Sequence, residues 1–150
     1  MFREYWNRPD ANAEAFVDGW FRTGDIARID DEGFLFIVDR AKDIVIRGGE
    51  NIGCGEIEDA IYTHPAVSEV VVFGVPDERM GEEVATMIVA KSGQNIDEDD
   101  MKEHLRSHLA GFQIPRYIFT QVDPLPRIAS GKFDKRSIRT EILTKFENNS

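Results

Sequence analysis

Residues 67–75 read Val-Ser-Glu-Val-Val-Val-Phe-Gly-Val, and residues 83–91 read Glu-Val-Ala-Thr-Met-Ile-Val-Ala-Lys. Both stretches have the length and the β-branched content of strands, and the turn-forming residues 76–79, Pro-Asp-Glu-Arg, separate them. The run 70–73 is continuously apolar rather than alternating, as expected for a strand that is covered on both faces. We therefore predict two consecutive strands and expect the first to be the central strand of a sheet.

Helical patterns lie on both sides of these strands. In residues 55–63 the apolar side chains share one face at helical spacing, and Glu56 and Glu58 favour the positive N-terminal end of a helix. Asp97 is a suitable N-cap for a second helix, which Gly111 is expected to end. The apolar side of that helix consists of Met101, Leu105, Leu109 and Phe112. A final helix is predicted at about 134–146.

Two further short strands complete the pattern, at 43–47 before the break Gly48-Gly49 and at 117–122. The order β-α-β-β-α-β-α predicts a small α+β domain, with an antiparallel or mixed sheet and helices packed on one face. Before it, the apolar runs 26–29 and 34–38 flank Asp-Asp-Glu-Gly, which predicts a β-hairpin. Because a two-stranded hairpin is marginal alone, it should pack on something else.

Composition limits the class of protein. A chain of 150 residues with 41% hydrophobic content can bury one modest core. The formal charge of -10 disfavours binding that neutralises a nucleic-acid backbone, so no nucleic-acid partner is expected. No apolar stretch approaches the roughly 18 residues of a membrane span, and the first residues lack the apolar run of a signal peptide. The expected location is cytoplasmic, and the single cysteine excludes an internal disulfide.

Three short constellations contain residues suited to chemistry. Asp25 follows Thr23-Gly24 and could accept hydrogen bonds from ribose hydroxyls, although a solvated turn aspartate has the same pattern. The pair Gly48-Gly49 would permit close approach of a ligand to the backbone. Lys132 follows Ser-Gly on a loop held extended by prolines, where it is either a mobile cation for phosphate oxygens or an ordinary surface lysine. No Walker-type phosphate loop is present.

Taken together and in order, these constellations resemble the last core motifs of the adenylate-forming superfamily, which includes acyl-CoA synthetases, peptide-synthetase adenylation domains and firefly luciferase. The matching stretches are Tyr5-Trp6-Asn7-Arg8-Pro9, Thr-Gly-Asp, Gly-Gly-Glu-Asn-Ile followed by Gly-Glu-Ile-Glu, Val75-Pro76-Asp77 and Ser-Gly-Lys. Each motif is weak alone, but five in the same order are strong. The resemblance covers nearly the whole chain and is greatest to acyl-CoA synthetases.

The resemblance implies a role for each matching position. Asp25 is expected to bind the ribose hydroxyls of ATP, and Arg40 to contact the nucleotide as well. Lys42 falls at the hinge between domains. Lys132 is expected to be catalytic, bridging the substrate carboxylate and the α-phosphate. The CoA channel is expected to contain Gly48 and Gly49.

The same resemblance implies the domain organisation and the partners. Residues 1–38 should be the end of a large N-terminal adenylation domain that this chain lacks, and 39–150 a mobile C-terminal domain. The expected function is ATP-dependent ligation of a carboxylic acid to coenzyme A with Mg²⁺, and the isolated chain should be inactive. A peptide-synthetase-type subdomain and a free-standing, non-catalytic interaction or dimerisation module are the alternatives, and homo-oligomerisation is left open.

A few other residues were considered as chemical groups. His104 and His108 have the spacing of a metal pair but lack a third ligand, so no metal site is expected and both should be solvated. Cys54 lacks a neighbouring base, which makes it a spectator rather than a nucleophile. Arg47 occupies a position where the resembled family commonly has a small or polar residue, which leaves open a contact from Arg47 to the phosphates of CoA.

Overall fold

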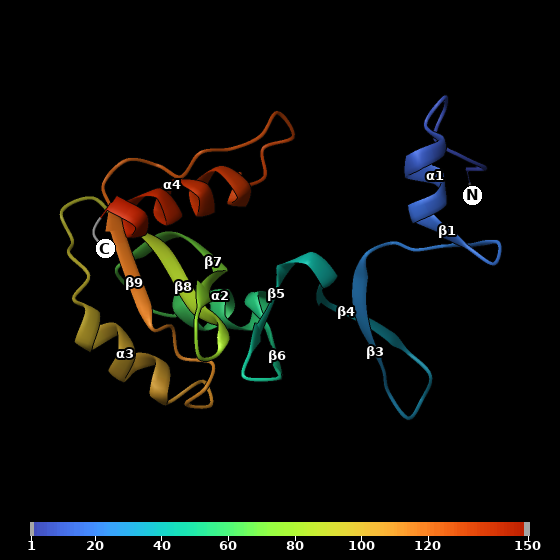
Figure 1. Cartoon of the computed structure of the whole chain (residues 1–150). Helices are drawn as coiled ribbons and strands as arrows, with labels where there is room; N and C mark the ends of the chain where they lie inside the picture. The colour runs from blue at the N-terminus through green and yellow to red at the C-terminus, as the bar shows by residue number, and fades with distance from the viewer. Residues whose placement is uncertain (1, 149–150) are drawn as a thin grey trace. The chain divides into compact units, whose positions relative to one another are not determined.

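The computed structural model describes residues 2–148 and divides into two compact units, one up to Lys42 and one from Asp43 on (Figure 1). The first unit contains α1 (Pro9–Ala15), a short pair of strands, β1 (Phe16–Val17) and β2 (Trp20–Phe21), and a second pair, β3 (Asp25–Ile29) and β4 (Leu35–Arg40). Strands β3 and β4 form the predicted antiparallel hairpin. Its turn is closed by the Asp30 side chain, which accepts hydrogen bonds from the N–H groups of Glu32 and Phe34.

Many apolar side chains of this first unit are exposed. Phe34, Leu35, Phe36, Ile37 and Val38 follow one another along the second strand of the hairpin, and each is between 46% and 68% exposed. Such a continuous exposed run is unusual for a stable surface, because apolar area left in water is unfavourable by about 25 cal/mol per Å². The described residues therefore do not supply the packing that the hairpin was predicted to need.

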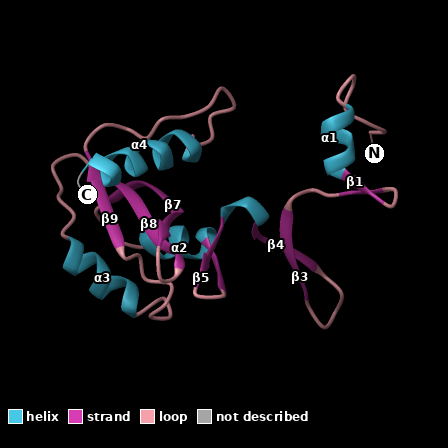
Figure 2. Ribbon diagram, viewed as in Figure 1, coloured by secondary structure: helices cyan, strands magenta, loops and turns pink. Residues whose placement is uncertain are grey.

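The second unit is built on a five-stranded sheet, confirming the predicted mixed α+β class (Figure 2). Its strands are β5 (Ile44–Arg47), β6 (Glu50–Gly53), β7 (Val67–Asp77), β8 (Gly81–Ala90) and β9 (Tyr117–Gln121). Strand β9 runs parallel to β8, whereas the other pairs are antiparallel. Strand β8 pairs with β5, β7 and β9, so it is the centre of the sheet.

The prediction that 67–75 forms the central strand was wrong, because within residues 2–148 β7 pairs with β8 alone. Its other edge is capped by side chains: Val72 N–H donates to Glu58 Oε1 at 2.8 Å, Val70 N–H donates to Tyr62 Oη at 3.4 Å, and Arg139 Nε donates to the Gly74 carbonyl at 2.6 Å. These bonds satisfy backbone groups that an edge strand would otherwise expose.

Helices cover both faces of the sheet, not one as predicted. Helices α2 (Cys54–Tyr62) and α3 (Glu98–Arg106) pack on one face and α4 (Lys135–Asn148) on the other, as Figure 1 shows for α3 and α4. Strand β7 alternates between the two cores: Val70 and Val72 belong to one, and Val71 and Phe73 to the other. The continuous apolar run therefore did indicate a strand buried on both faces.

Helix α3 begins as predicted and ends early. The Asp97 side chain caps it by accepting from the N–H groups of Asp99 at 3.0 Å and Asp100 at 3.1 Å. The helix ends at Arg106 rather than near Gly111, so the predicted apolar side is shortened. Leu109 remains in the core from the following turn, whereas Phe112 is 44% exposed.

Strand β6 was not predicted. The pair Gly48-Gly49 is not a break but the two-residue turn of a hairpin, because Arg47 pairs with Glu50 across it. Both glycines have positive φ, 57° and 91°, the pattern of a type I′ turn that few residues other than glycine and asparagine tolerate. The turn lies at the tip of the hairpin formed by β5 and β6.

Candidate functional site

Lys132 lies on a short, tightly bonded loop that leads into α4. Residues Arg127 and Phe133 form an isolated antiparallel bridge, and inside it Ile128 N–H donates to the Lys132 carbonyl at 2.9 Å. Gly131 N–H donates to the Ile128 carbonyl at 2.9 Å, and Gly131 has φ of +84°. Ser130 and Gly131 thus form part of a turn, and the loop is ordered by its own backbone bonds.

Arg127 fastens this loop to the sheet. Its guanidinium donates to the Gly131 carbonyl at 2.8 Å, pairs with Glu69 Oε1 of β7 at 2.7 Å, and lies over the Phe133 ring, 4.1 Å from the centroid. Glu69 also accepts from Leu125 N–H at 2.7 Å. Burial alone would raise the pKa of Glu69, but the bonds from Arg127 and Leu125 outweigh it and keep the pKa below its usual value.

The Lys132 side chain is exposed, and within residues 2–148 its ammonium has no hydrogen-bond or ion-pair partner. Lysines close to it in sequence differ: Lys135 pairs with Glu58 at 2.8 Å, and Lys145 with Glu141 at 2.7 Å. An unpaired cation on an ordered loop is suited to an anionic ligand that approaches from outside.

The first unit brings Asp25 and Arg40 together, the two residues predicted to bind nucleotide. They are paired across β3 and β4, and Arg40 Nε lies 3.0 Å from Asp25 Oδ1. Arg40 Nη1 also donates to the Thr23 carbonyl at 3.0 Å. The Asp25 side chain is 23% exposed, and its pair with Arg40 engages Oδ1. A carboxylate can accept several hydrogen bonds on its two oxygens, so Asp25 can also accept hydrogen bonds from a vicinal diol.

Lys42 lies in the single 3₁₀ turn η1 (Ala41–Asp43), which connects β4 to β5. The boundary between the two compact units falls directly after it. A short turn between compact units is the kind of segment in which changes in few φ and ψ angles produce a domain movement.

The Gly48-Gly49 turn differs between its two positions. A Cβ added at Gly48 would lie 2.5 Å from Met80 Cε, whereas one added at Gly49 would meet nothing within 4 Å. Gly48 is therefore packed against the chain, and Gly49 faces open space. Of the two residues predicted for the CoA channel, Gly49 is the one beside which a ligand could pass.

Arg47, next to this turn, is occupied by an internal ion pair. Its Nε lies 2.6 Å from Glu83 Oε2, and the Glu83 side chain is only 3% exposed. Arg116 Nη1 approaches the second oxygen of Glu83 at 3.4 Å. The hydrogen bond from Arg47 to Glu83 raises the pKa of Arg47 above its usual value. Arg47 therefore has a structural role as the partner of the buried Glu83, and this role is independent of any contact with a phosphate.

His104 is partly buried rather than solvated as predicted, whereas His108 is exposed as predicted. His64 joins His104 and His108, with ring centroids 5.1 Å and 4.7 Å apart, and His104 Nε2 lies 2.7 Å from Thr63 Oγ1. Burial, and next the neighbouring His108 and His64, hold the pKa of His104 below its usual value. Among residues 2–148 no group of three or more histidine, cysteine or acidic side chains is arranged to hold a metal ion.

Other groups near the site were misjudged or missed from the sequence. Glu58 lies beyond the first turn of α2 and pairs with Lys135 and β7, whereas Glu56 lies in the first turn, as predicted, and accepts from Gln113 Nε2 at 2.7 Å. Cys54 begins α2 and is 1% exposed. Arg127 lies close to Lys132 in the sequence, but its partner Glu69 is 58 residues away, so spacing gave no signal for the pair.

No helix in the described part of the chain combines the length and the apolar character that crossing a membrane requires. Residues 56–132, just over half of the chain, match the family model described as the AMP-binding enzyme C-terminal domain. The chain is 45% identical over 141 residues to long-chain-fatty-acid–CoA ligase FadD13 of Mycobacterium tuberculosis, covering 94% of this chain and 28% of that protein. It is 44% identical over 140 residues to feruloyl-CoA synthase of an Amycolatopsis species, with 93% and 28% covered.

The solved structures agree with these relatives. The complex of o-succinylbenzoate CoA synthetase from Bacillus subtilis with the acyl-adenylate OSB-AMP superposes with a TM-score of 0.84 at 36% identity, covering 91% of this chain and 28% of that one. The chain thus spans somewhat more than a quarter of the length of these relatives. The family resemblance inferred from the motifs is confirmed, and the chain belongs to the AMP-binding enzyme C-terminal domain family.

Proposed function

We propose that this chain is the C-terminal part of an ATP-dependent acyl-CoA synthetase and that it supplies the catalytic lysine of acyl-adenylate formation. The observation that carries the proposal is the Lys132 ammonium, which is unpaired within the described residues although its loop is fixed by Arg127 and Glu69. A fixed loop with one mobile, exposed cation can deliver charge to a defined point without prior loss of an internal ion pair.

The chemistry of adenylation requires such a cation. Attack of a carboxylate on the α-phosphate of ATP brings two anions together and accumulates charge on the phosphoryl oxygens. A positive charge placed at those oxygens stabilises the transition state more than the separated reactants. Lysine fits this role because its ammonium is a compact point charge on a flexible stem, which can approach and withdraw with the loop.

The first unit would contribute to nucleotide binding. Asp25 has acceptor capacity beyond its bond to Arg40, which fits the two hydroxyls of a ribose, and Arg40 is held beside it by the Thr23 carbonyl. Among residues 2–148 no three or more acidic, histidine or cysteine side chains are grouped to hold a metal ion, such as the Mg²⁺ that accompanies ATP, by themselves. We therefore assign Mg²⁺ to no residue of this chain.

The exposed apolar strand of the hairpin supports a large adenylation domain as the partner. Phe34 and the β4 residues Leu35 to Val38 are exposed, and the relatives are several times longer than this chain. A domain that covers this strand would bury the apolar area that water now contacts. The proposal assigns residues 1–38 to that domain and 39–150 to the mobile domain, with Lys42 as the hinge.

Thioester formation would use the Gly48-Gly49 turn. The open space beside Gly49 suits the narrow pantetheine arm of CoA, and Lys132 must withdraw for the second half-reaction. Rotation about Lys42 would exchange the Lys132 loop for this turn, so one domain would serve two steps. The carboxylic acid itself would bind in the large domain.

The test is substitution in the intact protein that contains this chain, with the two half-reactions assayed separately. Lys132→Ala should slow acid-dependent adenylate formation by at least about 10²-fold, the usual loss for one transition-state donor. The control is Lys145→Ala, which removes an exposed lysine whose partner among the described residues is Glu141 and should leave the rate unchanged. An unchanged rate in Lys132→Ala would refute the catalytic role.

Two additional assays separate the alternatives. The isolated 150-residue chain should neither form adenylate nor bind ATP appreciably, and turnover by it alone would contradict the two-domain proposal. Offering the intact protein CoA and a phosphopantetheinyl carrier protein as competing acceptors distinguishes an acyl-CoA synthetase from a peptide-synthetase-type enzyme. We expect CoA to be the preferred acceptor.

A further inference from the structure

Lys135 connects the Lys132 loop to the rest of the second unit. It is the first residue of α4, three positions after Lys132. A single residue, Asp134, separates the Arg127–Phe133 bridge from the helix. Asp134 N–H donates to the Pro126 carbonyl at 2.8 Å, which closes the base of the loop. Any displacement of the first turn of α4 therefore moves Lys132 with it.

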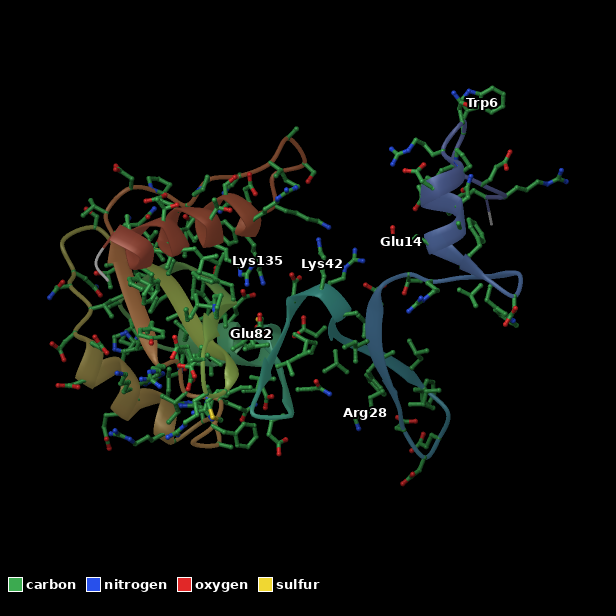
Figure 3. All side chains as sticks on the ribbon, in the orientation of Figure 1. Trp6, Glu14, Arg28, Lys42, Glu82 and Lys135 are labelled. Carbon is green, nitrogen blue, oxygen red and sulfur yellow. The ribbon has the colours of Figure 1, made fainter. Side chains whose placement is uncertain are left out.

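The Lys135 ammonium is held inside the unit rather than in solvent. Its side chain is 28% exposed and its Nζ lies 2.8 Å from Glu58 Oε1 of α2, whose side chain is 21% exposed. In Figure 3 the labelled Lys135 side chain points from the first turn of α4 toward the interior of the unit. Burial alone would lower the pKa of Lys135, but Glu58 and, to a smaller extent, Cys54 and Asp43 outweigh it and raise the pKa.

Glu58 is itself fixed by the sheet. The same oxygen that binds Lys135 accepts the Val72 N–H of β7 at 2.8 Å. One carboxylate thus joins three elements, α2, β7 and α4, at a point where the edge of β7 would otherwise be unpaired. A carboxylate bound by both a cation and a backbone N–H has little freedom to move.

Asp43 places this junction next to the hinge segment. It is the last residue of η1 and the first of the second unit, directly after Lys42, and its carboxylate is close enough to act electrostatically on Lys135. Among these acidic groups Glu58 is the direct partner of the Lys135 ammonium, and Asp43 adds a weaker electrostatic attraction. If the unit rotates about Lys42, the Glu58 junction keeps the first turn of α4 attached to α2 and β7.

We propose that Lys135, through its ion pair with Glu58, is a positioning residue that fixes the Lys132 loop relative to α2 and β7 of the second unit. This inference rests on the proposed function, because it assigns Lys135 an effect on adenylation through Lys132 and none on thioester formation. Catalysis is sensitive to such placement, since an error of about 1 Å in a reacting group can lower a rate by about 10²-fold.

A second cation on α4 provides the comparison. Arg139 lies one turn after Lys135, donates to the Gly74 carbonyl at 2.6 Å and lies 3.6 Å from Glu82 Oε1. Glu82, labelled in Figure 3, also accepts the Ile46 N–H of β5 at 2.9 Å. Arg139 thus anchors the same helix to the same sheet but is farther along the helix from Lys132. Loss of either cation should destabilise α4, and only loss of Lys135 should misplace the loop.

The experiment measures both half-reactions of the intact protein in Lys135→Met, Lys135→Arg and Arg139→Met. We expect Lys135→Met to lower the kcat of adenylate formation by about tenfold or more, with the KM for ATP little changed and thioester formation from supplied acyl-adenylate retained. Lys135→Arg keeps a cation of similar reach and should restore the rate to within about threefold. Arg139→Met should not change the ratio of the two rates.

Glu58→Gln provides a gentler variant if Lys135→Met fails to fold, because its amide oxygen can still accept the Val72 N–H while the charge is lost. It should lower adenylation selectively and by a smaller factor. Equal loss of both half-reactions in the folded Lys135 or Glu58 variants would overturn the proposal, as would the same selective loss in Arg139→Met. Lys132→Ala, measured in parallel, separates the two claims: if it impairs adenylation while Lys135→Met does not, only the positioning role is refuted.

Discussion

Replacing Arg47 by methionine tests whether this residue is structural, as its contacts indicate. The change keeps an unbranched side chain and removes the guanidinium, which leaves the Glu83 carboxylate 3% exposed without its 2.6 Å partner. Breaking a buried ion pair by removing one member costs about 3–5 kcal/mol, whereas an exposed pair contributes about 0–1 kcal/mol. Arg47 is 27% exposed and Arg116 remains 3.4 Å from Glu83, so the expected loss is about 2–4 kcal/mol.

The measurement is urea unfolding of the 150-residue chain. Far-ultraviolet circular dichroism is the suitable signal, because both tryptophans, Trp6 and Trp20, lie in the first unit and are exposed there. Arg106→Met is the matched control, since its ion pair with Glu103 is exposed on both sides, and it should lie within about 0.5 kcal/mol of the parent.

A double substitution sharpens this test. Arg47→Met combined with Glu83→Leu removes both charges and should recover most of the loss, because a buried pair replaced by apolar residues is often neutral in stability. If Arg47→Met destabilises the chain no more than Arg106→Met does, the reasoning from burial is refuted. Weaker CoA binding at unchanged stability would instead favour a phosphate contact from Arg47.

Two other predictions follow from the contacts. Arg127→Ala removes the bonds to Glu69 and Gly131 and the contact with Phe133. Because Arg127 is 46% exposed, we expect the free energy of unfolding in urea to fall by only about 1–2 kcal/mol. No loss would show that the loop is held by its backbone alone. Burial lowers the pKa of His104 from 6.5, so its neutral form stabilises the fold fully above that pH and the contribution declines as the pH falls below it. The stability advantage of the parent over His104→Gln should therefore shrink between pH 7.5 and about 5.5, and an advantage that grows on acidification would contradict the assigned environment.

The sequence was sufficient for elements whose signals are local. The cap at Asp97, the apolar face of α2 and the turn after Asp30 each depend on residues within a few positions of one another, and each is present. The pairing of Asp25 with Arg40 follows from the register of a hairpin that the sequence also predicted. In contrast, strand β6 was missed because Gly48-Gly49 fits either a break or a hairpin turn, and only the pairing of Arg47 with Glu50 decides between them.

Errors arose where the outcome depends on residues far apart in the chain. An apolar run indicates that both faces of a strand are buried, but the number of neighbouring strands depends on its edges. The edge of β7 is satisfied by Glu58, Tyr62 and Arg139, none of which its own sequence reveals. The same is true of the surroundings of Lys132: the motif predicts the lysine as a site residue, whereas Glu69 and Glu58, which support its loop and the following helix, come from distant elements.

The most direct test of the central claim is thioester formation by the Lys132→Ala variant of the intact protein, started from supplied acyl-adenylate and CoA. Lys132 is assigned to adenylation alone, so the rate should equal that of the parent within about twofold although adenylation from ATP has fallen by about 10². Gly49→Leu, which places a side chain in open space at a residue with φ of +91°, should show the reverse. Equal loss of both half-reactions in Lys132→Ala would contradict the assignment of adenylation to the Lys132 loop and of thioester formation to the Gly48-Gly49 turn.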